Sequence, residues 1–401
     1  MKPGLMDREK MIPDQRVYAT VDLDAVVSNM KAMKANLTKG TKMMGVVKAD
    51  GYGHGAVFVA HAIEPYVEFY GVATAEEGFV LRRHGITKPI LILGVVHERF
   101  YQALIKEEIR IPIFTWQQAE ILSKKAVSMG KQGIVHLVLD TGMSRIGGKA
   151  DQETRDLFLQ ISRLPGIVVE GLFTHFARAD EADKESVSEQ IKVYGQFVQM
   201  LKEKGLSIPV KHCSNSAGII DLPEANWDMV RAGISIYGLY PSDQVKQSQV
   251  ALTPAMELNS FITYVKRIEE GTPVSYGGTF VAPKPMTVAT VSVGYGDGYP
   301  RNLSGKGRVL IHGESARILG RVCMDQIVVD VTHIPEAKEW DQVTLLGRQN
   351  GEQILAEELA KSSGGFHYEI VCNIGKRVPR VYRKDGNVVG TMYFEAVISH
   401  V

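Results

Sequence analysis

The stretch Met43-Met-Gly-Val-Val-Lys48 is a short apolar run that ends in a lysine, and the glycine-rich turn Ala49-Asp-Gly-Tyr-Gly-His-Gly55 follows it. Short apolar runs of this kind are typical of strands in a parallel sheet, because helices cover both faces of such a sheet. Before it, residues 25–34 repeat apolar residues three and four positions apart, with Asp24 as the candidate N-cap of a helix. The pattern predicts alternating strands and helices.

Seven more runs of this kind follow further along the chain. With the first run, the predicted strands are residues 43–48, 70–73, 90–93, 111–114, 135–139, 168–174, 210–213 and 229–233. Eight strand-helix units over roughly 230 residues suit a TIM barrel, which typically takes about 250 residues, better than an open sheet. We therefore expect an α/β TIM barrel, (β/α)8, over residues 15–252, preceded by a short extension over residues 1–14.

The character of the chain changes near Pro254. Long helical patterns give way to β-rich runs, at residues 260–265, 287–293 and 326–331. Turn clusters such as Gly294-Tyr-Gly-Asp-Gly-Tyr-Pro300 separate these runs, and residues 352–363 form the one substantial helical pattern. A second, mostly β domain over residues 253–401 is the simplest interpretation.

The charge and cysteine content exclude several classes of function. With 46 Lys and Arg against 45 Asp and Glu, the formal net charge is +1, which offers no field for nucleic acid or an anionic membrane. No apolar run reaches the roughly 18 residues that span a bilayer, and the first ten residues lack the apolar stretch of a secretory signal. Three widely spaced cysteines predict neither a disulfide framework nor a zinc site. We expect a cytoplasmic protein with no bound metal and with neither nucleic-acid nor membrane partners.

Polar side chains recur at the carboxyl ends of the predicted strands, the face where TIM barrels hold their active sites. They are Lys48, Arg145, His175, Asn215, Ser216 and Arg231. A lysine beside flexible backbone suits Schiff-base chemistry, which needs a partly desolvated amine. Small residues and a serine after the last two strands suit an anion cradle that binds phosphate. A reactive lysine opposite a phosphate cradle indicates pyridoxal phosphate as the cofactor.

Each of these residues also has an ordinary structural interpretation. A single strand-end lysine is most often a solvated charge, and His175 alone fits a hydrogen-bonded core histidine. Arg145 and Arg231 fit ion pairs at the rim of a barrel. Their joint occurrence at successive strand ends favours one shared site over separate structural roles.

Nine short motifs occur in order along the chain, and the resemblance that they carry covers nearly all of it beyond the first dozen residues. They are Val46-Val-Lys-Ala-Asp-Gly-Tyr-Gly-His-Gly55, Asp140-Thr-Gly-Met-Ser-Arg145, Thr174-His-Phe176, Asn215-Ser-Ala217, Val230-Arg-Ala-Gly-Ile234, Val274-Ser-Tyr-Gly277, Val293-Gly-Tyr-Gly-Asp-Gly-Tyr-Pro-Arg301, Cys323-Met-Asp-Gln326 and Arg377-Val-Pro-Arg380. Through these motifs the chain resembles the alanine racemase family. Members of this family are fold-type III pyridoxal-phosphate enzymes with a TIM barrel and a C-terminal β domain.

By this resemblance, Lys48 holds the cofactor and is one of two catalytic bases. Tyr276 is the other base, and it comes with Met324 from the second subunit of a head-to-tail homodimer. Two bases suit racemisation because a proton leaves one face of Cα and arrives on the other. Since an ordinary tyrosine has a pKa of about 10, His175 is expected to polarise it. Arg231 is expected to donate to the pyridine nitrogen without giving up a proton, which weakens the electron sink and limits side reactions such as transamination.

The resemblance also implies a set of binding residues. Cofactor contacts are expected from Lys48, Tyr52, Asn215, Ser216, Arg231, Gly233, Ile234 and Lys376. Substrate contacts are expected from Arg145, Met324 and Tyr276, and the entrance positions are Tyr295 and Asp325. The guanidinium of Arg145 suits a planar carboxylate. Ordinary sheet-surface contacts are the alternative for Tyr295.

Two positions depart from the common family pattern. Gly375-Lys376 stands where family members have serine and tyrosine, and that tyrosine touches the phosphate and narrows the entrance. Lys376 keeps a charge but loses a rigid ring, so we expect a wider or more basic mouth, unless Lys376 points to solvent. Val138 stands where many family members have a lysine that becomes carbamylated and holds the residue equivalent to Arg145. Another acceptor, such as chloride or a carbonyl group, must then orient Arg145.

The expected function is interconversion of L-alanine and D-alanine. A racemase for serine or a broader set of amino acids, and a fold-type III decarboxylase, stay open as alternatives. Decarboxylases lack the Val274-Ser-Tyr-Gly277 arrangement in this context, and barrel proteins that bind pyridoxal phosphate without racemase activity lack the C-terminal β domain. The sequence leaves open whether the role is D-alanine biosynthesis or catabolism.

Overall fold

The computed structural model describes residues 16–393, which fall into two compact units. The barrel unit comprises Ala25–Gly51 and Ala56–Thr253. The β unit comprises the described residues up to Asp24, the segment Tyr52–Gly55 and the described residues from Pro254 onward. The predicted extension over residues 1–14 lies outside the described part of the chain.

Eight parallel strands form the main path of the barrel unit's sheet, in the order β10-β2-β3-β4-β5-β6-β8-β9. Their bounds are Lys42–Val46 (β2), Phe69–Val72 (β3), Ile90–Ile92 (β4), Ile109–Ile113 (β5), Gly133–Asp140 (β6), Ile167–Phe173 (β8), Val210–His212 (β9) and Met229–Ala232 (β10). The Asp228 N–H donates to Lys211 O (3.1 Å) and the Arg231 N–H to Ser214 O (3.0 Å), so the two end strands nearly close the ring. The predicted TIM barrel is confirmed, with each strand end within two residues of its expected position.

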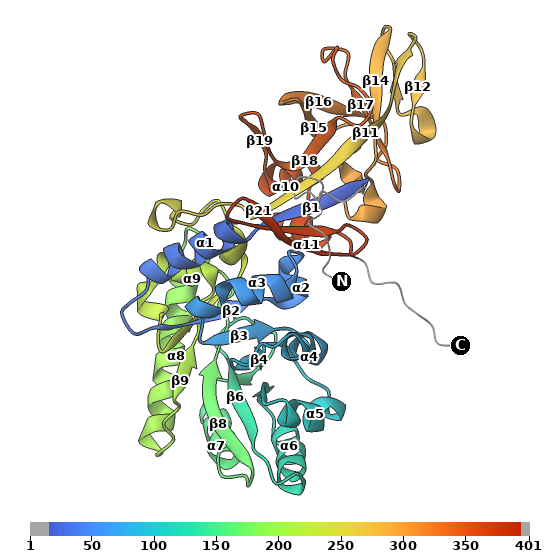
Figure 1. Cartoon of the computed structure of the whole chain (residues 1–401). Coiled ribbons are helices and arrows are strands. Elements are labelled where there is room, and N and C mark those ends of the chain that lie inside the picture. The colour runs from blue at the N-terminus through green and yellow to red at the C-terminus, as the bar shows by residue number, and fades with distance from the viewer. Residues whose placement is uncertain (1–15, 394–401) are drawn as a thin grey trace, which may run out of the picture. The chain divides into compact units, whose positions relative to one another are not determined.

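Helices alternate with these strands and lie around them in Figure 1. They are α1 (Leu23–Ala35), α3 (Ala56–Ile63), α4 (Ala75–Arg83), α5 (Tyr101–Lys106), α6 (Trp116–Ser128), α7 (Gln152–Ile161), α8 (Glu185–Glu203) and α9 (Ser216–Asp221). Local capping starts several of them, as in the capping box between Thr115 and Gln118 at α6. The N-cap prediction for α1 is wrong by two residues, because Asp22 Oδ1 accepts the Asp24 N–H at 2.8 Å.

The β unit is built on a ten-stranded sheet in the order β19-β18-β15-β16-β17-β14-β11-β1-β20-β21, which confirms the mostly β domain. Its strands are β1 (Val17–Asp22), β11 (Met256–Ile268), β14 (Met286–Val291), β15 (Arg308–Ile311), β16 (Glu314–Leu319), β17 (Ile327–Asp330), β18 (Gln342–Gln349), β19 (Glu352–Ile354), β20 (Arg380–Lys384) and β21 (Asn387–Met392). Because β18 pairs with β11 as well as β15, the strands from β18 to β11 close a ring. The helix predicted over residues 352–363 is shorter, α10 (Ala356–Ser363), since β19 pairs with β18.

The first described strand does not join the barrel. The barrel is expected over residues 15–252, yet β1 pairs antiparallel with β11 and parallel with β20. Val17 to Val21 are buried on both faces of the strand, which a position inside a sheet provides. At the other end, the division between Thr253 and Pro254 lies beside the expected boundary.

The segment Tyr52–Gly55 joins the β unit through very close approaches of its glycines. A Cβ on Gly53 would lie 2.1 Å from Val371 O, and one on Gly55 would lie 1.8 Å from Tyr382 Oη. Both glycines have positive φ, 82° and 89°, which other residues rarely adopt. The glycine content of this turn therefore has a structural cause in addition to any chemical one.

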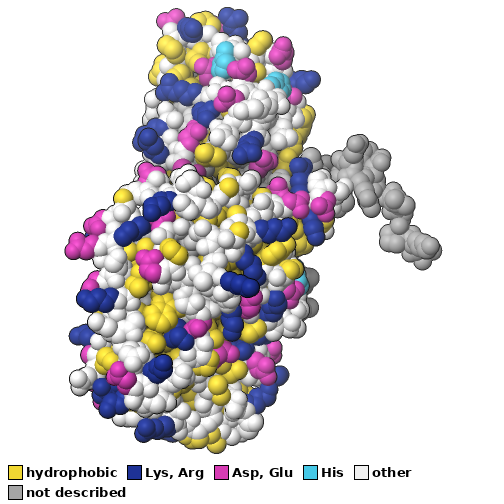
Figure 2. Space-filling view, turned by 90° about the vertical axis from the view of Figure 1, so that its left-hand side faces the viewer, with side chains coloured by type: hydrophobic (Ala, Val, Ile, Leu, Met, Phe, Trp, Pro, Cys, Tyr) yellow, Lys and Arg dark blue, Asp and Glu magenta, His cyan; other side chains and the backbone are white. Residues whose placement is uncertain are grey.

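Charged side chains of both signs are interspersed over the face shown in Figure 2, in keeping with the net charge of +1. This face presents no extended field of one sign that would steer a polyanion. Among the residues that the structure describes, no helix is both long and apolar enough to cross a bilayer.

We expect Gly53→Ala to lower the free energy of unfolding by roughly 3 kcal/mol, since a methyl group would meet a backbone carbonyl at a left-handed φ. Gly40→Ala is the matched control, because Gly40 has a φ of 94° but no atom within 4 Å of an added Cβ. This control should lose only about 1 kcal/mol. Thermal and urea unfolding of the purified variants measure both, and equal losses would contradict the prediction.

Candidate active site

The carboxyl ends of the barrel strands carry the six side chains predicted there, and four of them are basic. Lys48 follows β2, Arg145 follows β6, His175 follows β8 and Arg231 lies within β10. Burial lowers the pKa of His175 to about 3, with further lowering by the positive charges of Arg231, Arg145 and Lys48. His175 is therefore uncharged near neutral pH, and three cations from separate strand ends act on it.

The backbone after Lys48 turns in the left-handed sense. Ala49 and Asp50 have φ of 52° and 50°, a conformation that costs an L-residue about 1–2 kcal/mol. The carboxylate of Glu77 holds the turn, accepting the N–H of Ala49 at 2.7 Å and that of Ala73 at 2.6 Å. Strained backbone held by such bonds is typical of functional sites. Glu77 thus fixes the main chain beside Lys48.

The Arg231 guanidinium is buried among acceptors from the ends of β8 and β9. Nη1 donates to His212 Nδ1 (3.0 Å) and His212 O (3.1 Å). Nη2 donates to Thr174 O (2.8 Å), Cys213 O (2.9 Å) and His175 Nδ1 (3.0 Å). Burial lowers the pKa of Arg231 to about 10, so the side chain keeps its charge at neutral pH. The guanidinium therefore joins three strand ends.

These bonds determine which donors remain. A neutral imidazole that accepts at Nδ1 carries its proton on Nε2, so His175 has an Nε2–H to donate. The Nε–H of Arg231 donates to no residue in the described part of the chain. One N–H from His175 and one from Arg231 are thus available to a ligand.

Ser216 organises the loop after β10. Its Oγ accepts the Gly233 N–H at 2.9 Å, so the predicted phosphate donor Gly233 instead supports Ser216. The Ser216 hydroxyl proton and the Ile234 N–H have no acceptor within residues 16–393. Two such donors suit a phosphate oxygen. Asn215, also predicted as a cofactor contact, caps α9 by accepting the Gly218 N–H at 3.0 Å.

The loop that carries Arg145 is held through its backbone. Asp140 Oδ1 accepts three successive N–H groups, those of residues 142–144, at 2.9 to 3.1 Å. Val138 is 2% exposed and offers no polar group. The Arg145 side chain itself is exposed. The position of this loop therefore depends on Asp140.

In the β unit, Tyr276 begins the short turn η7 (Tyr276–Gly278) between strands β12 (Pro273–Val274) and β13 (Phe280–Val281). A hydrophobic cluster that includes Val274 anchors this hairpin. Ser275 Oγ donates to Arg321 O at 2.6 Å. The Tyr276 side chain is 70% exposed in the single chain. A firmly held turn thus presents an exposed phenol.

Neighbouring loops of the β unit bring the other predicted residues of this unit together. The Gly296 N–H donates to Met324 O at 2.9 Å, which links the loop of Tyr295 to that of Met324. Asp325 pairs with Arg377 at 2.6 Å. Arg377 follows Lys376, whose side chain is exposed.

Large apolar side chains on these loops are exposed to an unusual degree. Tyr295 is 41% exposed and Met324 is 53% exposed, in addition to Tyr276. Tyr52, also in this unit, packs near Tyr368 with ring centroids 6.2 Å apart. Exposed apolar groups of this kind are typical of surfaces that meet a partner.

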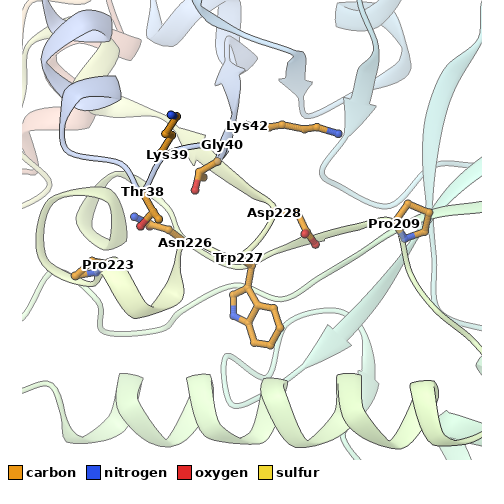
Figure 3. A pocket seen from close by; sticks show the side chains of 10 residues that line it. Thr38, Lys39, Gly40, Lys42, Pro209, Pro223, Asn226, Trp227 and Asp228 are labelled. Carbon is orange, nitrogen blue, oxygen red and sulfur yellow. The ribbon is translucent and has the colours of Figure 1, made fainter.

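A cavity of about 440 Å³ lies at the opposite end of the barrel strands. Figure 3 shows its lining, which comes from residues 38–42 before and at the start of β2, Pro209 before β9, and Pro223 and Asn226 to Asp228 before β10. The amino-terminal end of a TIM barrel supports stability rather than chemistry. Within the described residues, no group of three or more His, Cys, Asp or Glu side chains could hold a metal ion.

Sequence reasoning missed several residues that organise the site. Glu77 is one, and Gln190 is another: its Nε2 donates to Thr141 Oγ1 and His175 O, both at 3.1 Å, and its Oε1 accepts the Ala177 N–H at 3.0 Å. No motif signals either residue. His212 lies in the predicted strand over residues 210–213, and its position near the end of that strand was the one signal in the sequence.

Comparison with known proteins places these features in a family. A model described as "Alanine racemase, N-terminal domain" matches residues 21–241, and "Alanine racemase, C-terminal domain" matches residues 255–382. An alanine racemase of Clostridium perfringens is 44% identical over 374 residues, 93% of this chain and 97% of the relative. One of Methanococcus maripaludis is 40% identical over 91% of this chain and 98% of the relative.

Solved structures agree with the sequence comparison. The alanine racemase of Clostridium difficile 630 matches with a TM-score of 0.92 and 39% identity, covering 95% of this chain and 99% of the other. The alanine racemase of Bacillus anthracis with bound L-Ala-P matches with a TM-score of 0.90 and 33% identity, covering 95% and 98%. With both domains matched over nearly their whole length, this chain belongs to the alanine racemase family.

Proposed function

We propose that this chain is a pyridoxal-phosphate-dependent racemase that interconverts L-alanine and D-alanine. The observation that carries the proposal is the 44% identity to an alanine racemase over 93% of the chain. The convergence of Lys48, Arg145 and Arg231 around His175 supports it independently. The direct test is racemisation of purified protein supplied with pyridoxal phosphate, measured as deuterium exchange at Cα of L- and D-alanine. No exchange with any amino acid would overturn it.

The residues present fit the cofactor. The Ser216 hydroxyl and the Ile234 N–H are donors for its phosphate, and the Arg231 Nε–H is a donor for its ring nitrogen. Lys48 would hold its aldehyde carbon, and Tyr52 and Lys376 are proposed as further phosphate contacts. When bound, pyridoxal phosphate supplies an electron sink for the pair left at Cα. Because a guanidinium donates without releasing its proton, Arg231 would keep that sink moderate.

The chain's own residues would move the proton. Lys48 Nζ and Tyr276 Oη are the two bases, each serving one face of Cα. The proton of His175 lies on Nε2, and such a donor favours the ionised form of a phenol oxygen that it reaches. Arg145 would bind the substrate carboxylate, with Met324 beside it. Tyr295 and Asp325 are proposed to line the entrance.

The alternatives are less well supported. Each relative compared above is named an alanine racemase, which favours alanine over serine and racemisation over decarboxylation. The β unit carries Tyr276 on an anchored turn, so a barrel that only binds the cofactor is also a weaker explanation. The cytoplasmic location stays a prediction from the sequence.

We further propose a head-to-tail homodimer in which Tyr276 and Met324 of one subunit complete the barrel site of the other. The exposure of Tyr276, Met324 and Tyr295 supports this arrangement, since a monomer would leave these large side chains in water. A symmetric dimer would use the same surface twice and form two equivalent sites.

Mixed dimers test the sharing of sites. Lys48→Ala and Tyr276→Phe chains are each expected to be inactive as homodimers. Refolded or co-expressed in equal amounts, they should recover about a quarter of wild-type activity, since half of the dimers would be mixed and each would hold one intact site. Activity no higher than that of the separate variants would contradict catalysis by Tyr276 in trans.

Lys376→Tyr should narrow the choice of substrate. A rigid ring would reduce the space at the entrance, so the ratio of kcat/KM for alanine to that for leucine should rise about threefold or more. Lys338→Tyr, at another exposed lysine of the β unit, is the control and should leave the ratio unchanged. Equal ratios in wild type and Lys376→Tyr would count against a wider entrance at Lys376.

A further inference from the structure

A chain of polar side chains runs through the barrel interior behind Arg231. His136 lies on β6, Glu170 on β8 and His212 at the end of β9. Both histidines are 0% exposed, and neither belongs to the two-base mechanism. Buried polar groups need hydrogen-bond partners, and both ring nitrogens of each imidazole have one.

The bonds form one unbranched path. Arg231 Nη1 lies 3.0 Å from His212 Nδ1, His212 Nε2 lies 2.9 Å from His136 Nδ1, and His136 Nε2 lies 3.0 Å from Glu170 Oε2. The guanidinium begins the path and a carboxylate ends it. Each intermediate nitrogen faces one partner along the path.

Chemistry determines the direction of every bond. Arg231 can only donate, so His212 accepts at Nδ1 and carries its proton on Nε2. His212 then donates to His136 Nδ1, which leaves the His136 proton on Nε2, facing an ionised carboxylate that can only accept. Burial lowers the pKa of both imidazoles, and bonds from His136 and Arg110 hold the pKa of Glu170 at about 2. All protons of the path therefore point from Arg231 toward Glu170.

Neighbouring residues keep the path in place. Arg110 clamps Glu170 with two bonds, Nε to Oε2 at 2.9 Å and Nη2 to Oε1 at 3.0 Å. The Phe173 ring stacks on His212 with centroids 5.2 Å apart. Gly171 makes room for His136, because a Cβ there would lie 2.2 Å from His136 Nδ1. Residues of β5 and β8 thus hold Glu170 and leave room for the two imidazoles.

Arg231 needs such a path because none of the carboxylates in the described part of the chain bonds to it directly. A buried cation is costly unless a counter-charge or fixed dipoles offset it. The negative charge of the path lies on Glu170, and two imidazoles separate it from Arg231. Because hydrogen bonds in a chain polarise one another, the two imidazoles transmit part of the electrostatic effect of the Glu170 carboxylate to the guanidinium.

We propose that His212, His136 and Glu170 are positioning residues for Arg231, forming a directed hydrogen-bond relay that holds its guanidinium in one orientation and lowers its strength as a proton donor at Nε. The relay itself follows from this chain's own bonds, and its effect on catalysis rests on the proposed function. In that function it keeps the Arg231 Nε–H a weak donor toward the cofactor's ring nitrogen.

Neutron diffraction from crystals exchanged into deuterated buffer near neutral pH tests the relay without cofactor or activity. We expect one deuteron on each of His136 and His212, at Nε2, and a deprotonated Glu170. A deuteron on His212 Nδ1, or on both nitrogens of either imidazole, would overturn the proposed direction.

Two variants interrupt the relay at its outer end. Glu170→Gln removes the charge at constant shape, and His136→Asn keeps an acceptor for His212 but no longer reaches Glu170. Each should lower kcat for alanine about tenfold, because the guanidinium is no longer held in one orientation, while KM stays within about twofold. Each should also shift the ¹⁵N signal of bound, ring-labelled pyridoxal phosphate toward that of a protonated pyridine. Glu189→Gln, which removes an exposed carboxylate paired with Lys192 in the same unit, should change neither quantity.

The outcomes separate the two proposals. Wild-type kcat and an unshifted ¹⁵N signal in Glu170→Gln and His136→Asn would overturn the positioning role, even if their melting temperatures fall. A protein that binds no pyridoxal phosphate would overturn the proposed function, while the deuteron positions would still decide the relay.

Discussion

One buried guanidinium organises the end of the barrel where the chemistry is expected. Arg231 lies in the last strand, and its Nη groups bond carbonyl oxygens and imidazoles at the ends of β8 and β9. Taking such a cation out of water costs several kcal/mol unless its donors find acceptors, so these strand ends must present their carbonyl groups to it. The same bonds place the protons of His175 and His212. The arrangement of these strand ends and the protonation pattern of the site therefore both depend on the bonds of Arg231.

The two units contribute different kinds of side chain to the proposed site. The barrel unit supplies cations and neutral imidazoles on strand ends, where the sheet holds them rigidly. The β unit supplies Tyr276, Tyr295 and Met324 on loops that are bonded to one another but exposed. Rigid positions suit groups that orient charge, and exposed loops suit groups that must meet a second subunit. Each unit alone lacks one of the two proposed bases.

The sequence predicted the barrel well because each strand is a short apolar run with a clear end, and helical periodicity separates the runs. It was wrong where two local structures fit the same residues. Asp22 and Asp24 both suit an N-cap, and Glu352–Ile354 suits a helix as well as a strand. Pairing of β19 with β18 decides the second case. β1 likewise pairs with strands more than two hundred residues away, which no local pattern reveals.

By itself, the sequence determined the alternation of strands and helices, the family motifs and the residue types at the strand ends, because these depend on neighbours along the chain. Only the tertiary structure decided the hydrogen-bond partners, such as Gly233 with Ser216, Gln190 with the loop of His175, and His136 with Glu170. Such partners lie far apart in sequence, and the register of neighbouring strands brings them within bonding distance. The positions of the protons on His175, His212 and His136 follow from those partners, so the tertiary structure decides them as well.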